Sequence, residues 1–455
     1  MDLLHEAAER AITYLDGLAE RRVAPAPEAL RRLTEFHEAL PEQPTDPLAV
    51  LRRLDELGSP ATMASAGPRF FGFVIGGALP VTVAANWLAT AWDQNAVLFA
   101  AAPGAAVLEE VALSWLVELL GLPPGTGGAF VTGATVANFT ALAAARQAVL
   151  ARAGWDVEAD GLFGAPPVTV VVGDEAHPSL MKALSLLGLG QKRVVRVSVD
   201  GQGRLRADRL PKLAGPAIVC LQAGNVNTGA FDPFAEVCAA AHAAGAWVHV
   251  DGAFGLWARA APERAHLAAG VEQADSWATD AHKWLNIPYD SGLAFVREAG
   301  ALRAAMTQNA PYLPQGQHRE PAQFVPELSR RARGVEVWAA LRALGRAGLA
   351  EIIERNCRQA ARFAEGLRAA GHAVLNDVEL NQVLVAFGDA ALTQRVIAAL
   401  QADGTCWAGG TVWQGQTAMR LSVSSWATTD GDIERSLAAI LRIAEELSGS
   451  RSAAS

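Results

Sequence analysis

Lys283 is the residue of this sequence with the clearest potential for covalent chemistry. It lies in the stretch Ala281-His282-Lys283-Trp284, and the chain contains only four lysines, because nearly all its other positive charge is arginine. A guanidinium can replace an ammonium in most surface roles, but it cannot form an imine with a carbonyl group. Lys283 is therefore a candidate for imine chemistry, although a surface lysine with a buried aliphatic stem is the alternative for this stretch alone.

Three other short stretches offer groups that suit one cofactor. Asp251 ends the apolar run 247–250, where a buried carboxylate is unfavourable unless it meets a cation. The turn Gly133-Ala134-Thr135 precedes a helix-like run whose first N–H groups can bind a phosphate, and His177 offers a flat ring. Each feature alone has a purely structural explanation. Together, these residues suit a small molecule that carries a ring-nitrogen cation, an aldehyde and a phosphate. Pyridoxal phosphate carries all three, and its protonated ring acts as an electron sink.

The elements that position these groups form one repeating pattern. Apolar strands alternate with amphipathic helices, which predicts an α/β fold with a mostly parallel sheet covered on both faces. Ligands of such sheets bind beyond the carboxyl ends of the strands, where His177, Asn225–Thr228, Asp251 and Asp280–Lys283 are expected. The expected strands are 127–132, 168–172, 194–199, 217–221, 247–250, 276–279 and 292–296, with helices at 134–152, 179–187, 207–214 and 234–244.

The composition excludes several classes of protein. At 455 residues, with 19% charged and 51% hydrophobic residues, the chain is typical of a globular protein with more than one domain. Its net charge of -9 argues against nucleic acid or an anionic membrane as a partner. No membrane span or signal peptide is visible, and four separated cysteines indicate reduced thiols without a metal site. We therefore expect a cytoplasmic protein.

Four regions are expected along the chain. Residues 1–66 hold short amphipathic helices broken by prolines, which need the main body or a second subunit to cover their apolar faces. Residues 67–334 form the large cofactor-binding domain, and residues 335–448 form a smaller C-terminal α+β domain with strands at 373–375, 383–387 and 419–424. The segment 308–329 has the character of a lid, and the tail 449–455 is expected to be disordered.

The motifs together resemble a known family. The order Gly133–Asn138, Asp174–His177, His249–Ala253 and Asp280–Trp284 is similar to that of the group II pyridoxal-phosphate-dependent decarboxylases. That family includes decarboxylases of aromatic amino acids, glutamate, histidine and diaminobutyrate, and the resemblance runs from about residue 67 to residue 338. It implies the fold of aspartate aminotransferase, known as fold type I, with a seven-stranded sheet. It also implies a homodimer with active sites at the subunit interface.

The resemblance implies a role for each matching residue. Lys283 forms the internal aldimine with pyridoxal 5′-phosphate, Asp251 pairs with the pyridinium nitrogen, and His177 stacks on the ring. The other implied cofactor contacts are Ala253 on the opposite ring face, Gly133, Ala134, Thr135 and His282 at the phosphate, Asp280 at a position that often holds Asn or Asp, and Thr228 in a loop near the cofactor.

The implied reaction is decarboxylation of an L-amino acid to its amine. The substrate amine displaces Lys283, CO2 leaves, and a proton returns to Cα. In many family members a tyrosine on the mobile loop is implicated in that last step, but this sequence has none between residues 313 and 329. Tyr312 matches a different family position. His318 or His177 is therefore the expected proton donor.

Two other interpretations remain open. In relatives with phenylalanine in place of the loop tyrosine, oxygen intercepts the carbanion and an aldehyde forms, and Phe324 lies on the loop of this chain. Oxidative deamination, or another carbon–carbon lyase reaction, is thus the second interpretation, and a non-catalytic cofactor-binding protein is the third. An aromatic amino acid is slightly favoured as the substrate. Candidate substrate contacts are Phe70, Phe71 and Phe73 for an apolar side chain, and Arg69 or Arg420 for the carboxylate.

Overall fold

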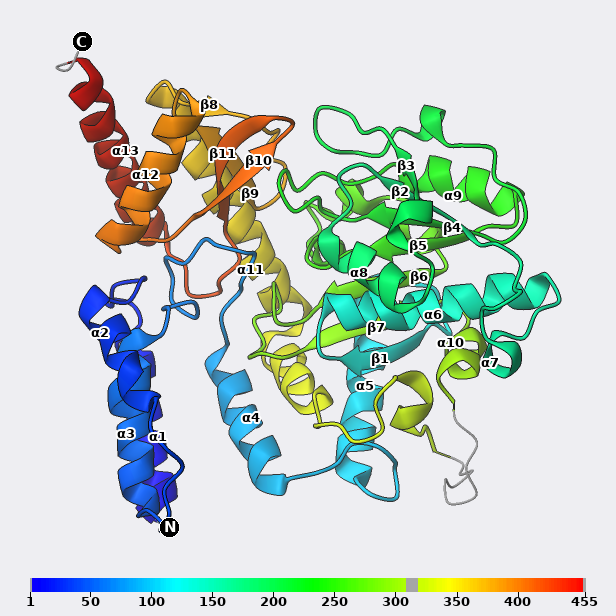
Figure 1. Ribbon diagram of the computed structural model, residues 1–455, viewed down its shortest axis with the longest axis horizontal. Helices are drawn as coiled ribbons and strands as arrows, with labels where there is room; N and C mark the ends of the chain where they lie inside the picture. The colour runs from blue at the N-terminus through cyan, green and yellow to red at the C-terminus, as the bar shows by residue number, and fades with distance from the viewer. Residues whose placement is uncertain (1, 308–317, 453–455) are drawn as a thin grey trace. The chain divides into compact units, whose positions relative to one another are not determined.

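The computed structural model describes residues 2–307 and 318–452 (Figure 1). The chain forms two compact units, each built from separate stretches of sequence. The smaller unit comprises residues up to Gly77, Gln359–Leu375 and residues from Val383 onward, and the larger comprises Ala78–Arg358 and Asn376–Gln382. The expected boundaries at 66/67 and 334/335 do not coincide with these limits. Helix α11 (Gly334–Ala369) continues past Arg358, so no linker composition marks the change of unit.

The larger unit is built on a seven-stranded sheet of order β1-β7-β6-β5-β4-β2-β3. Strands β2 to β6 run parallel to one another, whereas β7 is antiparallel to both β6 and β1. Every residue of β1, β4, β5, β6 and β7 is buried, which confirms a sheet covered on both faces. The strands are β1 (Gly127–Val131), β2 (Thr169–Gly173), β3 (Val195–Val197), β4 (Ala217–Gln222), β5 (Trp247–Asp251), β6 (Ser276–Asp280) and β7 (Gly292–Val296).

Helix α6 (Ala134–Arg152) packs against β5, β6 and β7 (Figure 1). Its buried face is rich in alanine, and the small side chains let the helix axis approach the sheet closely. This helix begins directly after β1, so its N-terminus lies where the chain leaves the sheet. The other helices of the unit are α4 (Pro80–Trp92), α5 (Pro103–Leu119), α7 (Val157–Asp160), α8 (Pro178–Leu186), α9 (Phe234–Ala243), α10 (Ala299–Met306) and the first part of α11.

The smaller unit carries a four-stranded sheet of order β10-β11-β9-β8. Its core includes Phe71, packed edge-on against Phe363, and Phe70, stacked on Trp407 at 5.0 Å between ring centroids. The strands are β8 (Ala373–Val374), β9 (Gln382–Ala386), β10 (Gly409–Trp413) and β11 (Gln416–Ser422), and the helices are α1 (Asp2–Asp16), α2 (Pro27–Arg32), α3 (Pro47–Ala61), α12 (Ala390–Asp403), α13 (Asp430–Ser452) and the second part of α11.

Several local expectations differ from the structure. The expected helix at 207–214 is only a 3-10 turn, Ala207–Arg209, because Pro211 cannot continue a helical hydrogen-bond pattern. Strand β10 was not predicted, since its residues alternate weakly in hydrophobicity. Helix α13 continues to Ser452, so the expected disordered tail is helical over residues 449–452. Residues 453–455 lie outside the described part of the chain.

The expected lid is described only from His318 onward, and residues 308–317, including Tyr312, lie outside the described residues. Residues 320–325 are largely buried, whereas His318, Leu328 and Ser329 are exposed. Glu320 is buried and accepts a hydrogen bond from the Phe99 backbone N–H, and Ala322 N–H donates to the Val97 carbonyl. Phe324, which lies under the guanidinium of Arg319, is also buried.

Candidate active site

The ends of two adjacent strands bring the central residues together. Asp251 is the last residue of β5 and Asp280 is the last residue of β6, and these strands are parallel neighbours. Parallel strands end at the same edge of a sheet, so both carboxylates lie at that edge. The turn after β6 carries His282 and Lys283. The sequence expectation that these groups share one edge is therefore met for this part of the site.

Lys283 forms an ion pair with Asp280. Its Nζ lies 3.1 Å from Asp280 Oδ2, and the side chain of Asp280 is only 3% exposed. The next residue, Trp284, is fully buried, and its indole N–H donates to Asn356 Oδ1 at 3.0 Å. This buried contact anchors the turn that carries Lys283. Lys283 is thus held at the sheet edge by a buried carboxylate and is not a freely moving surface lysine.

His282 is neutral and has a defined tautomer. Burial lowers the pKa of His282 below its ordinary value, and the Ser291 backbone N–H donates to its Nδ1 at 3.1 Å. Because Nδ1 is an acceptor, the proton of the neutral ring lies on Nε2. That nitrogen is 3.6 Å from Asp280 Oδ1, so His282 and Lys283 flank the same carboxylate.

The Gly133 turn lies against this cluster. A Cβ added to Gly133 would lie 3.2 Å from His282 Cε1, and one added to Gly292 of β7 would lie 2.4 Å from Gly133 Cα. The close approach therefore requires glycine at position 292 and leaves little room for a side chain at position 133. Gly133 is the N-cap of α6, so Ala134 and Thr135 occupy the first turn, whose N–H groups have no acceptor within the helix. These donors, beside His282, suit a bound phosphate.

Asp251 is a buried carboxylate without a cation. It is 5% exposed, its Oδ2 accepts from Asn138 Nδ2 at 3.1 Å, and its Oδ1 accepts from the Ala253 backbone N–H at 3.2 Å. Among the described residues, no lysine, arginine or histidine forms an ion pair with it. A buried carboxylate of this kind is costly unless a cation completes the site. The Asp251 carboxylate therefore fits a protonated ring nitrogen, such as the one that pyridoxal phosphate carries.

His177 and Thr228 are held by local hydrogen bonds. His177 is the N-cap of α8, where its Nδ1 accepts from the Ser179 backbone N–H at 3.2 Å. The Thr228 hydroxyl donates to the Gln202 carbonyl at 2.7 Å, which uses its only hydrogen. Thr228 therefore stabilises its own turn, and any contact of its side chain with a ligand would be as an acceptor. The contacts of His177 and Thr228 with the cofactor therefore remain predictions.

Two residues near the cluster had no role in the sequence analysis. Tyr289 lies in the turn before β7, and its ring centroid is 4.3 Å from that of His282. Burial, with a smaller effect of the Asp280 carboxylate, raises the pKa of Tyr289 to about 12. Asn138 was noted only as part of a motif, yet it is fully buried and donates to Asp251. The sequence signal that could have placed Asn138 in the site was its position four residues after Ala134, on the same face of α6.

Other expected residues have partners of their own in the structure. His318 stacks on Phe99 at 3.8 Å between ring centroids. Arg69 is buried in the smaller unit, where it donates to the Ala19, Arg21 and Thr405 carbonyls and pairs with Asp432. Its guanidinium is therefore a structural tie within that unit, and the expectation that it binds a substrate carboxylate is not supported. Arg420 is partly buried in the same unit.

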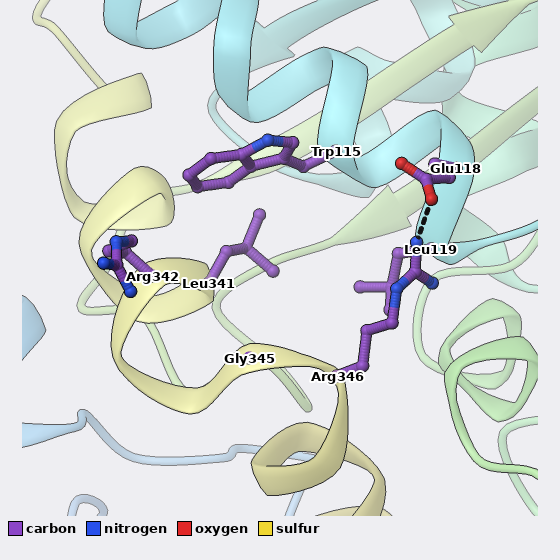
Figure 2. Close-up of a pocket in the computed structure, with 7 residues that line it drawn as sticks. All are labelled: Trp115, Glu118, Leu119, Leu341, Arg342, Gly345 and Arg346. Atoms are coloured by element: carbon purple, nitrogen blue, oxygen red, sulfur yellow. Dashed lines mark hydrogen bonds and ion pairs between the residues drawn. The ribbon is translucent and has the colours of Figure 1, made fainter.

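A separate pocket of about 430 Å³ lies between α5 and α11 (Figure 2). Its walls include Trp115, Leu119 and Leu341, and Arg346 pairs with Glu118 at its rim. Helix α11 is interrupted here at Gly345, whose φ of 58° is left-handed. The lining residues include none of the candidate active-site residues.

Over the described ranges, no helix is long and apolar enough to cross a membrane.

Comparisons with known proteins identify the family of this chain. The family model of the pyridoxal-dependent decarboxylase conserved domain matches residues 27–388. L-2,4-diaminobutyrate decarboxylase of Rhizobium meliloti (strain 1021) is 30% identical over 449 residues, which cover 92% of this chain and 86% of that protein. Aromatic-L-amino-acid decarboxylase of Bacillus atrophaeus is 28% identical over 363 residues, covering 77% of this chain and 73% of that protein.

A solved structure shows the same fold. The crystal structure of Oryza sativa TDC with PLP and tryptamine superposes with a TM-score of 0.91 at 24% identity, over 98% of this chain and 97% of that chain. The predicted family, fold class and cofactor are confirmed by these matches. This chain belongs to the pyridoxal-dependent decarboxylase family, as a carboxy-lyase of amino acids with pyridoxal 5′-phosphate as its cofactor.

Proposed function

We propose that the cluster around Lys283 is the active site and that Lys283, Asp251 and His177 are its catalytic residues. The observation that carries this proposal is the buried, cation-free Asp251, at the end of the strand next to the one that leads to Lys283. When bound, pyridoxal phosphate supplies an aldehyde for attachment to an amine and a protonated ring that takes up the electrons released as CO2 leaves.

Lys283 supplies the amine. Its ion pair with Asp280 holds the nitrogen at the sheet edge, and loss of one proton makes that nitrogen a nucleophile. Asp251 supplies negative charge for the ring nitrogen. Its two oxygens each accept one N–H group from the protein, which leaves lone pairs on both for a further donor. Ala253, two residues later, has a side chain small enough for a ring to approach closely.

The phosphate site consists of Gly133, Ala134, Thr135 and His282. The first N–H groups of α6 would donate to the phosphate oxygens of the cofactor, and the positive end of the helix dipole would favour the negative charge. His282 carries its proton on Nε2 and can donate it to the same group. Asp280 Oδ1 lies 3.6 Å from the same nitrogen, and its negative charge helps to orient the ring.

The decarboxylated carbon must receive one proton. His177 Nδ1 faces the backbone N–H and the hydroxyl of Ser179, so Nε2 is the ring nitrogen available for proton exchange. The protonated ring would release its Nε2 proton, keep the Nδ1 proton directed at Ser179 Oγ, and become a neutral imidazole. We therefore propose His177 Nε2 as the proton donor. His318, which is stacked on Phe99, is the second candidate.

The substrate class and assembly are finer proposals. An aromatic L-amino acid is favoured by the similarity to aromatic-L-amino-acid decarboxylase. A homodimer is favoured by the exposed apolar side chains of α4, because such a row is unusual on a monomer surface. A cytoplasmic location is favoured by the four free cysteines.

The reaction is tested with a panel of L-amino acids. We expect CO2 and the amine in equal amounts, without hydrogen peroxide. An aldehyde with peroxide would instead show oxidative deamination, and bound cofactor without turnover of any amino acid would show a non-catalytic protein.

The attachment site is tested with Lys283→Ala. This variant should lose the absorbance band that borohydride reduces, together with covalent labelling of the chain by cofactor and borohydride. Lys182→Ala, which removes an exposed lysine of α8, is the matched control and should keep both. Unchanged labelling of the Lys283→Ala protein would contradict the assignment.

A further inference from the structure

A buried row of polar side chains lies behind Asp251. Residues two apart on a strand point to the same face, so Trp247, His249 and Asp251 of β5 share one face of the sheet. Ser276 of β6 is the register partner of His249, and Asn138 of α6 lies over the same face. Exposed fractions are 0% for Asn138, His249 and Ser276, 5% for Asp251 and 6% for Trp247. Water therefore does not satisfy these groups.

The five side chains form one continuous hydrogen-bonded chain. Trp247 Nε1 lies 2.9 Å from Ser276 Oγ, and Ser276 Oγ lies 2.9 Å from His249 Nδ1. His249 Nε2 lies 2.8 Å from Asn138 Oδ1, and Asn138 Nδ2 lies 3.1 Å from Asp251 Oδ2. No link of this chain exceeds the distance of an ordinary hydrogen bond.

One set of bond directions satisfies every member of this chain. An indole N–H can only donate, so Ser276 Oγ accepts from Trp247 and its own hydrogen is left to donate to His249 Nδ1. The neutral ring then carries its proton on Nε2 and donates to Asn138 Oδ1. The Asn138 amide group is thereby oriented with its NH2 toward Asp251, which must accept.

The opposite direction is unfavourable. If His249 donated through Nδ1, Nε2 would have to accept from Asn138, and the Asn138 oxygen would face the Asp251 carboxylate. Two oxygens would then meet in a buried place unless Asp251 took up a proton. The hydrogen-bonded chain therefore favours Asp251 as an anion with a fixed orientation.

We propose that Trp247, Ser276, His249 and Asn138 are positioning residues that hold the Asp251 carboxylate as an oriented acceptor for the ring nitrogen of the cofactor. This inference rests on the proposed role of Asp251. The four positioning residues are buried, so we assign them no contact with the substrate. Their effect reaches the cofactor through Asp251 alone.

The electrostatic surroundings agree with this arrangement. Burial lowers the pKa of His249 to about 3, so the ring remains neutral at physiological pH. The titratable groups nearest to it are Asp251 on its own strand and Cys220, its register partner on β4. Burial raises the pKa of the Cys220 thiol, so that group is also neutral. Asn138 and Ser276, on α6 and β6, carry no charge, and Asp251 is the only charge in this row.

The inference is tested with two substitutions of His249 in the full-length protein. His249→Gln keeps an acceptor and a donor in one side chain, whereas His249→Leu removes both. We expect His249→Leu to weaken binding of pyridoxal phosphate about tenfold or more, because a buried donor and acceptor lose their partners. His249→Gln should stay within about threefold of the unsubstituted protein. Cofactor affinity is measured by quenching of tryptophan fluorescence, and the absorbance of the bound cofactor is followed between pH 6 and 9.

Two further variants separate positioning from general stability. Asn138→Leu breaks the last link and should weaken cofactor binding as His249→Leu does. Thr140→Val, also buried on α6, removes a hydroxyl with no hydrogen-bond partner in the described structure and should leave affinity and spectrum unchanged. If His249→Leu fails to fold, Ser276→Ala takes its place in the test. This variant should weaken cofactor binding by a smaller factor.

The inference is overturned if His249→Leu and Asn138→Leu bind the cofactor with unchanged affinity and an unchanged pH response. It is equally overturned if His249→Gln is as defective as His249→Leu. Failure of the proposed active site would look different, because borohydride labelling would then survive Lys283→Ala in an otherwise unsubstituted protein.

Discussion

At the scale of single residues, the charge of Asp251 is the property on which the site depends. Asp251→Asn keeps the shape of the side chain but removes the negative charge that favours a protonated ring nitrogen. We expect kcat to fall roughly 100-fold or more, which corresponds to about 3 kcal/mol of lost transition-state stabilisation. Steady-state kinetics with the best substrate of the panel measure this loss.

The matched control is Asp232→Asn. Asp232 is another buried aspartate of the larger unit, and it accepts N–H groups from Leu205 and Gln222. Its substitution should lower thermal stability without a comparable loss of kcat in the protein that remains folded. Equal losses of kcat in the two variants would mean that Asp251 acts only through the fold.

Tyr289 gives a second prediction at this scale. Its hydroxyl keeps its proton across the working range, because burial raises the pKa of Tyr289 to about 12. Tyr289→Phe should therefore leave the pH dependence of kcat/KM between pH 6 and 9 unchanged. Tyr289→Ala removes the ring that packs on His282 and should weaken cofactor affinity about two- to tenfold. A changed pH profile in Tyr289→Phe would instead assign the hydroxyl a direct chemical role.

At the scale of elements, the approach of β7 to the start of α6 determines the phosphate site. Gly292→Ala places a methyl group 2.4 Å from Gly133 Cα, so the turn or the strand must move. We expect a loss of about 1–3 kcal/mol in the free energy of unfolding, together with weaker cofactor binding. Gly300→Ala is the control, because nothing lies within 4 Å of its added Cβ in α10. Thermal unfolding with and without cofactor distinguishes the two variants.

The elements also show what the sequence could and could not predict. The largely apolar runs at 217–221, 247–250 and 292–296 predicted buried strands, because strands covered on both faces lack a regular polar alternation, and the structure has strands there. The direction of β7 could not be predicted, since its composition is the same in a parallel or an antiparallel neighbour. The same holds for the contact of Asn138 with His249, which joins residues 111 positions apart. Their places in an alanine-rich helix and in a largely apolar strand indicated burial, but only the packing of α6 on the sheet makes them partners.

At the scale of the whole molecule, the division into units was the least predictable feature. The smaller unit joins the N-terminal residues to Gln359–Leu375 and to the C-terminal region, and no composition change at 358/359 marks that boundary. Arg69 illustrates the consequence. Its position beside three phenylalanines suggested a substrate pocket, yet its partners Thr405 and Asp432 are more than 330 residues away and bury it in the core of the smaller unit.

The proposed homodimer is also a property of the whole molecule. Val81, Leu88 and Trp92 of α4 are 40%, 55% and 49% exposed, and their spacing of seven and four residues places them on one helix face. An exposed apolar row of this kind is expected to be covered in an assembly. Leu88→Glu with Trp92→Glu would bring two charges into the interface and should shift a dimer toward monomer, measured as molar mass by light scattering across a dilution series. Phe163→Glu, at a side chain that is 98% exposed outside α4, should leave the mass unchanged. If the doubly substituted protein stays dimeric at every concentration, the interface lies on another surface and α4 is not part of it.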